Sequence, residues 1–235
     1  MTLNSLMPRL CMGKFLIRCA FFTCALVALS PIPHAKADLV YDNSLTYLGE
    51  GYNPGANEVG DEIILGPGSR TATNFTFEYY GLNFYAGGVT NEQAELRFYL
   101  NDGSGGAPNT QFYDSGQFDI PETNRATLHF DLRFEDLELP DSFTWTVQFF
   151  GIDPGESAGL TLYSPPTIGT NYTDFWERDL AGWTLRTNSD GVTPMDFGAQ
   201  VYAFDLPPIP EPATVAIGLL AGLALLVVKF SRRRE

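Results

Sequence analysis

The segment between residues 38 and 208 contains no cysteine, no lysine and a single histidine, His129. All three cysteines of the chain, Cys11, Cys19 and Cys24, lie before this segment. Without a thiol the segment can form no disulfide and carry out no thiol catalysis, and one histidine is too few for a histidine-rich zinc site. A Ser-His-Asp triad would have to use His129. The segment therefore has few side chains suited to catalysis, and we expect no enzyme activity.

Positive charge is also scarce in this segment. It contains 26 acidic residues against six arginines, which gives a net charge of −20. Such a surface repels nucleic acid and anionic lipid, so neither is expected as a partner. It attracts divalent cations weakly and favours solubility outside the cell. About 170 residues are enough to bury the core of one domain without cross-links.

A short apolar run marks the N-terminal part of the chain. Three basic residues precede the run over residues 19–29, and the small-residue triplet Ala35-Lys36-Ala37 follows it. Charged, apolar and A-x-A segments in this order are typical of a secretory signal peptide. We therefore expect signal peptidase to remove residues 1–37, so that the mature chain begins at Asp38. An uncleaved anchor is disfavoured, because the run is short and prolines follow it.

A second apolar run, over residues 213–228, contains no charged residue. As a helix it would extend about 24 Å, somewhat less than a hydrocarbon core of roughly 30 Å, so Phe230 and a snorkelling Lys229 would complete the span. We predict one transmembrane helix here. Basic residues gather only on its C-terminal side, and by the positive-inside rule they place that end in the cytoplasm and the preceding domain outside. They are Lys229, Arg232, Arg233 and Arg234.

The triplet Pro210-Glu211-Pro212 stands directly before the apolar run. The two prolines disfavour helix and hold Glu211 on a stiff, extended segment at the outer boundary of the membrane. A processing enzyme could bind such an extended segment. An ordinary single-pass anchor that carries the triplet by chance is the alternative.

Together, the triplet, the short Ala/Gly/Leu-rich run and the terminal Arg cluster resemble the PEP-CTERM sorting signal of Gram-negative bacteria that secrete exopolysaccharide. The resemblance covers residues 210–235, about a ninth of the chain, within a tail that spans residues 207–235. It implies an exosortase partner, a membrane cysteine peptidase or transpeptidase that removes the helix. One departure is that Lys229-Phe230-Ser231 separates the helix from the Arg run, whereas many relatives continue directly into Arg. Some proteins described as ice-binding have a similar tail, but the regular Thr array that ice binding requires is absent here.

Alternation of apolar and polar residues with a period of two dominates residues 38–206 and predicts half-buried β-strands. Turn-forming clusters such as Gly66-Pro67-Gly68 and Asp153-Pro154-Gly155 separate the strands. Eight or nine short strands joined in this way predict an all-β domain, a single antiparallel β-sandwich or jelly roll. The clearest apolar faces are Phe75/Phe77/Tyr79, Leu96/Phe98/Leu100, Ala126/Leu128/Phe130/Leu132, Phe143/Trp145/Val147/Phe149, Leu160/Leu162 and Phe197/Ala199/Val201/Ala203.

Several polar groups are candidates for catalytic or metal sites. His129 and Asp131 share the polar side of one strand and are interpreted as surface neighbours. The pairs Glu135-Asp136 and Glu177/Asp179 could form a two-carboxylate glycosidase site, but in so acidic a domain such pairs arise by chance. The stretch Asn101-Asp102-Gly103-Ser104 offers oxygens for calcium but lacks the EF-hand spacing, so a hairpin loop is favoured. We expect no cofactor, with weak calcium binding as the alternative.

The most suggestive binding feature is an aromatic group, Tyr172, Trp176 and Trp183, near several planar polar side chains. Aromatic faces beside polar groups are suited to sugar recognition, although the same rings could fill the core. We therefore expect an exported, non-catalytic surface or extracellular-matrix protein, anchored in the inner membrane as a precursor and then placed on the cell surface or secreted. A carbohydrate-binding module for exopolysaccharide is the alternative, and a glycoside-active enzyme is less favoured.

Overall fold

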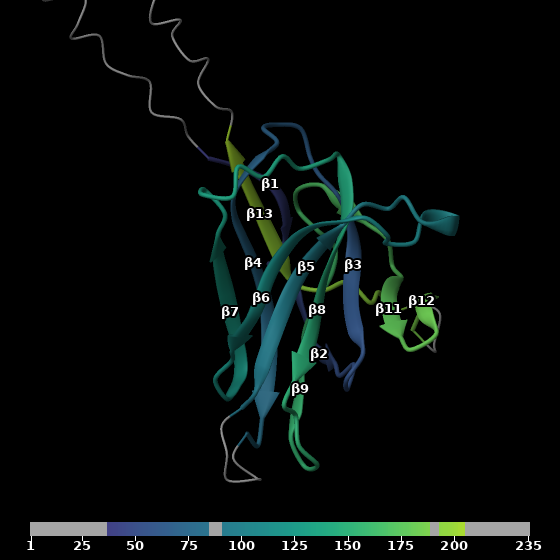
Figure 1. The fold of residues 1–235 in the computed structure, drawn as a ribbon. Coiled ribbons are helices and arrows are strands. Elements are labelled where there is room, and N and C mark those ends of the chain that lie inside the picture. Colours follow the sequence, from purple (N-terminus) through teal and green to yellow (C-terminus); the bar gives the residue numbers. More distant parts are fainter. Residues whose placement is uncertain (1–36, 85–90, 189–192, 205–235) are drawn as a thin grey trace, which may run out of the picture. The chain divides into compact units, whose positions relative to one another are not determined.

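The computed structural model describes residues 37–84, 91–188 and 193–204 (Figure 1). The predicted sorting tail, with its Pro-Glu-Pro triplet, transmembrane helix and Arg cluster, lies outside these residues, as does nearly all of the predicted signal peptide. Within the described ranges no helix has the length and apolar character needed to cross a membrane. Every β-strand described belongs to one of two antiparallel sheets.

The first sheet is organised around the long strand β4. β4 has 12 residues and pairs with β7 along one edge. Along its other edge it pairs first with β13 and then with β9. Strands β1 and β2 pair with β13 and β9, respectively. The bounds are β1 (Asp38–Asn43), β2 (Tyr47–Tyr52), β4 (Thr71–Leu82), β7 (Thr123–Asp131), β9 (Ser157–Tyr163) and β13 (Ala199–Phe204).

The second sheet has the order β12-β11-β3-β8-β5-β6, and the short β10 also pairs with β3. A 3₁₀ turn, η1 (Ser104–Gly106), lies in the connection between β5 and β6. The bounds are β3 (Glu58–Ile64), β5 (Gln93–Tyr99), β6 (Gln111–Asp119), β8 (Ser142–Phe150), β10 (Thr170–Asn171), β11 (Phe175–Asp179) and β12 (Gly182–Arg186).

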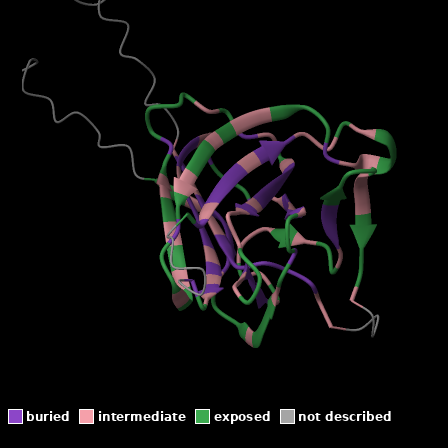
Figure 2. Ribbon diagram, turned by 60° about the horizontal axis from the view of Figure 1, so that its bottom comes forward, coloured by how far each residue is buried: buried purple, intermediate pink, exposed green. Residues whose placement is uncertain are grey.

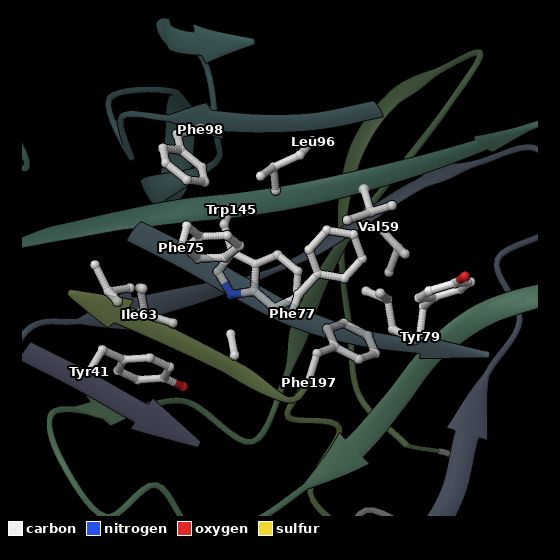
Figure 3. Packing of buried hydrophobic residues seen from close by; sticks show 14 of the residues in the cluster. Tyr41, Val59, Ile63, Phe75, Phe77, Tyr79, Leu96, Phe98, Trp145 and Phe197 are labelled. Carbon is white, nitrogen blue, oxygen red and sulfur yellow. The ribbon is translucent and has the colours of Figure 1, made fainter. Parts of the chain in front are cut away.

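The two sheets pack face to face over an aromatic core (Figure 3). Trp145 of β8 is fully buried and contacts rings from the first sheet: the ring centroids of Phe75 and Phe77 lie 5.3 Å and 5.8 Å from that of Trp145. The ring centroid of Phe98, on β5, lies 4.9 Å from that of Phe75. Inward-facing residues of both sheets thus form one core, and the predicted all-β, antiparallel class is confirmed.

The described residues contain thirteen strands, more than the eight or nine predicted. Strands β1, β2, β10 and β11 were missed because none of them alternates clearly. β2 reads Tyr-Leu-Gly-Glu-Gly-Tyr, with two glycines, and β10 has only two residues. In β1, the four consecutive residues Val40–Asn43 are buried, so both faces of the strand are covered and no alternation is visible. Tertiary pairing, rather than local pattern, makes these segments extended.

The two ends of the domain lie on neighbouring strands. β1 begins at Asp38, which pairs with Ala203 near the end of β13. All thirteen described strands therefore fall between residues 38 and 204. The described strands therefore begin after the predicted signal peptide and end before the predicted sorting tail.

Candidate functional site

The outer face of the second sheet is polar in sequence but largely buried in the structure. In β3, β5 and β8, the residues that alternate with the core residues point to this face. They would normally face water, yet Thr144 and Thr146 are fully buried and Glu58 is only 3% exposed. Something must therefore cover the outer face.

The cover is the β11–β12 hairpin. Tyr99 on β5 and Trp183 on β12 are separated in the sheet by β8, β3 and β11, yet their ring centroids are 5.5 Å apart. Such a contact requires the sheet to curl strongly, so that the hairpin folds back over its outer face. Figure 2 shows the hairpin set off from the buried central strands, with exposed residues along it. The result is a concave face lined by charged and aromatic groups.

Glu58 is the centre of the charge network on this face. Its carboxylate lies 3.1 Å from the guanidinium of Arg97 and 3.6 Å from that of Arg178, and it accepts a hydrogen bond from the Thr146 hydroxyl. Arg97 also pairs with Glu95, at 2.6 Å. Burial alone would lower the pKa of Arg97, but Glu58 and Glu95 outweigh it and raise that pKa. The buried carboxylates of this face are thus neutralised by arginine.

The three aromatic residues predicted to bind glycan differ in exposure. Trp176 is only 7% exposed, so its ring is covered and we assign it to packing rather than to ligand contact. Trp183 is partly exposed, and the Arg178 guanidinium lies over its ring at 5.5 Å. Tyr172, in the β10–β11 connection, is 49% exposed. In the β11–β12 ladder Trp176 pairs with Leu185, and Trp183 pairs with Arg178. Both tryptophans therefore lie on the same side of the hairpin.

The groups weighed for catalysis do not form an acid–base arrangement in the structure. His129 is exposed on β7, and the carboxylate of Asp131 accepts hydrogen bonds from Arg133, which lower the pKa of Asp131 to about 2. Glu177 is buried and accepts hydrogen bonds from Tyr52, Asn57 and Arg186.

The remaining acidic residues considered at the sequence level have structural roles or face solvent. Asp179 is exposed and accepts the backbone N–H of Ala181 in the hairpin turn. Glu135 and Asp136 are exposed in the connection after β7.

The oxygens of the predicted calcium-like loop are used within the hairpin itself. Both carboxylate oxygens of Asp102 accept hydrogen bonds from Thr110, one from its backbone N–H at 2.9 Å and one from its hydroxyl at 2.6 Å. These bonds lower the pKa of Asp102. Asn101 accepts a hydrogen bond from Thr144. This pattern favours the hairpin-loop interpretation of residues 101–104.

A shallow hollow of about 510 Å³ lies at the loop end of the domain, between the β2–β3 and β8–β9 connections. Its polar lining includes Asn53, Gln148 and Asp153. The described lining contains no basic side chain, and its aromatic side chains are Phe149 and Phe150, the last two residues of β8.

Sequence reasoning missed the Glu58–Arg97–Arg178 network. Alternation does place Arg97 between the core residues Leu96 and Phe98, and so on the outer face. This alternation could have predicted that the Arg97 side chain lies on the outer face of the sheet. Its partners could not have been found, because they lie on other strands.

One comparison with known proteins gives a match. The family model described as the PEP-CTERM protein-sorting motif matches residues 208–234. Neither a curated protein nor a solved structure matches the chain.

Proposed function

Because the chain carries a PEP-CTERM protein-sorting motif, we propose that it is an exported, non-catalytic surface or extracellular-matrix protein whose tail an exosortase removes. The motif is that of exported proteins handled at the membrane by an exosortase-type enzyme. The specific course that we propose has three steps. Signal peptidase cleaves after Ala37, residues 213–228 hold the precursor in the inner membrane with Lys229 and the Arg run inside, and the exosortase acts near Pro210-Glu211-Pro212.

The position of the folded domain supports this course. All thirteen described strands lie between residues 38 and 204, and the first of them, β1, pairs with the last, β13. Cleavage at both proposed places would leave every one of these strands in the mature protein. A domain that is complete without its targeting segments can fold outside the membrane and remain folded after release.

The chemistry of the outer face supports a role without catalysis. On that face Glu58 and Glu95 pair with Arg97, and on the first sheet the Asp131 carboxylate, near His129 in the sequence, accepts hydrogen bonds from Arg133. A general acid or base needs a titratable group placed against a substrate with a suitable pKa. Carboxylates that are held by arginine are less available for that role.

The intact mass of the surface or secreted form tests the proposed processing. We expect the N-terminus near Asp38 and loss of the residues from about Ala213 onward. Glu211→Ala should leave the larger, membrane-held precursor, whereas the exposed control Glu122→Ala should be processed normally. If the wild-type protein keeps the residues from Ala213 onward, and Glu211→Ala has the same mass and location, the tail acts only as an anchor.

Carbohydrate binding is the second candidate function, favoured by the accessible rings of Trp183 and Tyr172. The ring of Trp183 lies under the guanidinium of Arg178, so an aromatic face and a planar hydrogen-bond donor occur together at the rim of the concave face. Sugars bind to such pairs by stacking and hydrogen bonding. An anionic polysaccharide would be repelled by the net charge of the domain, which favours a neutral glycan.

Titration with exopolysaccharide from the producing strain, followed by Trp fluorescence, tests this second function. Trp183→Ala and Tyr172→Ala should both reduce the affinity. Tyr172→Ala should leave the thermal unfolding temperature nearly unchanged, whereas Trp183→Ala should also lower it, because it removes the ring contact with Tyr99. Trp176→Ala is the control for packing, since it should lower the unfolding temperature. Saturable binding that survives both of the first two substitutions would place the glycan elsewhere, and turnover of the glycan would favour an enzyme.

A further inference from the structure

One edge of β7 has no strand beside it in the part of the chain that the structure describes. There β7 pairs with β4 alone, and Figure 1 shows it as the outermost strand on its side of the first sheet. Directly after β7, the N–H of Leu132 donates to the carbonyl oxygen of Thr73 on β4 at 2.9 Å. Backbone groups alternate in direction along an antiparallel strand. Thr127, His129 and Asp131 therefore direct their N–H and C=O groups to the open edge.

This edge lacks the features that usually prevent strands from pairing between molecules. Natural edge strands are commonly protected by bulges, prolines or lysines. β7 contains neither proline nor lysine, and its register with β4 is unbroken from Ala126 to Asp131. β6, at the end of the second sheet, differs: its register with β5 shifts in two places, and it carries Asp114 and Asp119 without a basic residue. β7 is therefore the better suited of these two edges to accept another strand.

Apolar side chains beside the open edge are incompletely covered. Ala126, Leu128 and Phe130 pack against the core but are only partly buried. Phe134, three residues after β7, is 86% exposed. A strand added to the edge would extend the sheet and cover part of this apolar row. Backbone hydrogen-bonding groups and apolar surface thus lack a partner at the same place.

We propose that β7 pairs with β7 of a second copy of this chain, antiparallel and about a two-fold axis at Leu128. Thr127 of each copy then exchanges backbone hydrogen bonds with His129 of the other. A second register, with the axis at Thr127, would satisfy the direction of the backbone groups equally well. Such an isologous contact closes on itself and gives a dimer. It uses no residue of the sorting tail and does not depend on the proposed processing or on glycan binding.

Charge complementarity favours a second copy as the occupant and selects the register. With the axis at Leu128, Arg125 of each copy lies directly opposite Asp131 of the other, and opposite charges in such cross-strand pairs are stabilising. The second register would place Arg125 opposite His129 instead. In the single chain, Arg125 lies 3.3 Å from Glu78, and Asp131 accepts hydrogen bonds from Arg133. A guanidinium has five N–H donors and a carboxylate several lone pairs, so both groups can add the new contact.

Sedimentation velocity of the full chain in detergent, at increasing protein concentration, tests the dimer. Thr127→Pro removes an N–H that β4 does not use, and edge strands accept proline at such positions. Thr127→Ala keeps the N–H and is the matched control. The wild type and Thr127→Ala should dimerise, whereas Thr127→Pro should bind at least about tenfold more weakly and unfold at nearly the wild-type temperature. A wild-type chain that stays monomeric at about 0.1 mM, or a folded Thr127→Pro that dimerises equally well, would overturn the proposal.

Disulfide cross-linking tests the register without relying on the proline variant. Cys11, Cys19 and Cys24 are first replaced by serine, and Leu128→Cys is then introduced. At the two-fold axis, residue 128 of each copy faces its counterpart in a pair without backbone hydrogen bonds, where Cα atoms lie about 4.5 Å apart, within reach of a disulfide. Oxidation should therefore give a covalent dimer on a non-reducing gel.

Gln117→Cys, exposed on β6, is the control for the cross-link and should remain monomeric. Equal cross-linking of both cysteine variants would indicate random collision or association through another part of the chain. Cross-linking of Gln117→Cys alone would place the contact at β6. Either result, or no cross-link in either variant, would contradict pairing through β7.

Discussion

Replacement of Glu58 by glutamine should destabilise the domain more than any exposed charge replacement. The substitution keeps the size of the side chain and a hydrogen-bond acceptor for Thr146, and it removes only the charge. Arg97, whose side chain is 15% exposed, then loses its 3.1 Å partner and retains Glu95. Arg178 loses its 3.6 Å partner but remains about half exposed to water.

The expected loss of unfolding free energy in Glu58→Gln follows from these exposed fractions. Removing one member of a fully buried ion pair costs about 3–5 kcal/mol, because the remaining charge is left unpaired. Here Arg97 keeps a second carboxylate and Arg178 is partly solvated, so we expect a loss of about 2–3 kcal/mol. In a domain of this size each kcal/mol shifts the midpoint by about 2–4 °C, which gives a decrease in Tm of about 4–12 °C.

Urea and thermal unfolding of the full chain would measure this loss. Asp141→Asn is the matched control: it breaks the Arg70–Asp141 bridge, which has a similar length of 2.9 Å but an aspartate side chain that is 88% exposed. A surface pair of this kind contributes little, so the control should unfold near the wild-type temperature. If Glu58→Gln is no less stable than Asp141→Asn, the network on the concave face does not hold the curled sheet together.

Three further predictions concern the core and its tyrosines. Trp145→Ala should cost about 3–5 kcal/mol of unfolding free energy in urea, because it empties the centre of the aromatic core. Gly60→Ala should lower the Tm sharply, since the new Cβ would lie 1.9 Å from the Trp145 carbonyl oxygen; an unchanged Tm would mean that β3 and β8 can separate. Burial raises the pKa of Tyr52, Tyr79 and Tyr113 to about 12, with nearby acidic groups adding to the effect at Tyr52 and Tyr113. Their neutral forms therefore favour the folded state, so stability should be unaffected below pH 10 and be lost between about pH 10 and 12. The ultraviolet absorbance of tyrosinate should show these groups titrating together with unfolding; ionisation near pH 10 in the folded protein would contradict their burial.

Features that a contiguous stretch of residues encodes could be predicted from the sequence. The sorting motif depends on the covalent order of a triplet, an apolar run and a basic cluster, and the family model matches it at residues 208–234. The strongest strands, such as β4 and β8, depend on an alternation that needs no knowledge of partners, because one face of a strand meets the core wherever the strand lies.

Only the tertiary structure decided which distant residues meet. Tyr99 and Trp183 come together because the second sheet curls, and no local pattern specifies that curl. The same holds for Asp61, whose carboxylate accepts a hydrogen bond from the backbone N–H of Phe197, 136 residues further along the chain. Trp176, predicted as a ligand contact, is covered for the same reason. Strand pairing and sheet curvature arise from the free energy of the whole core, so the concave face and the contact between Asp61 and Phe197 exist only once both sheets have packed against each other.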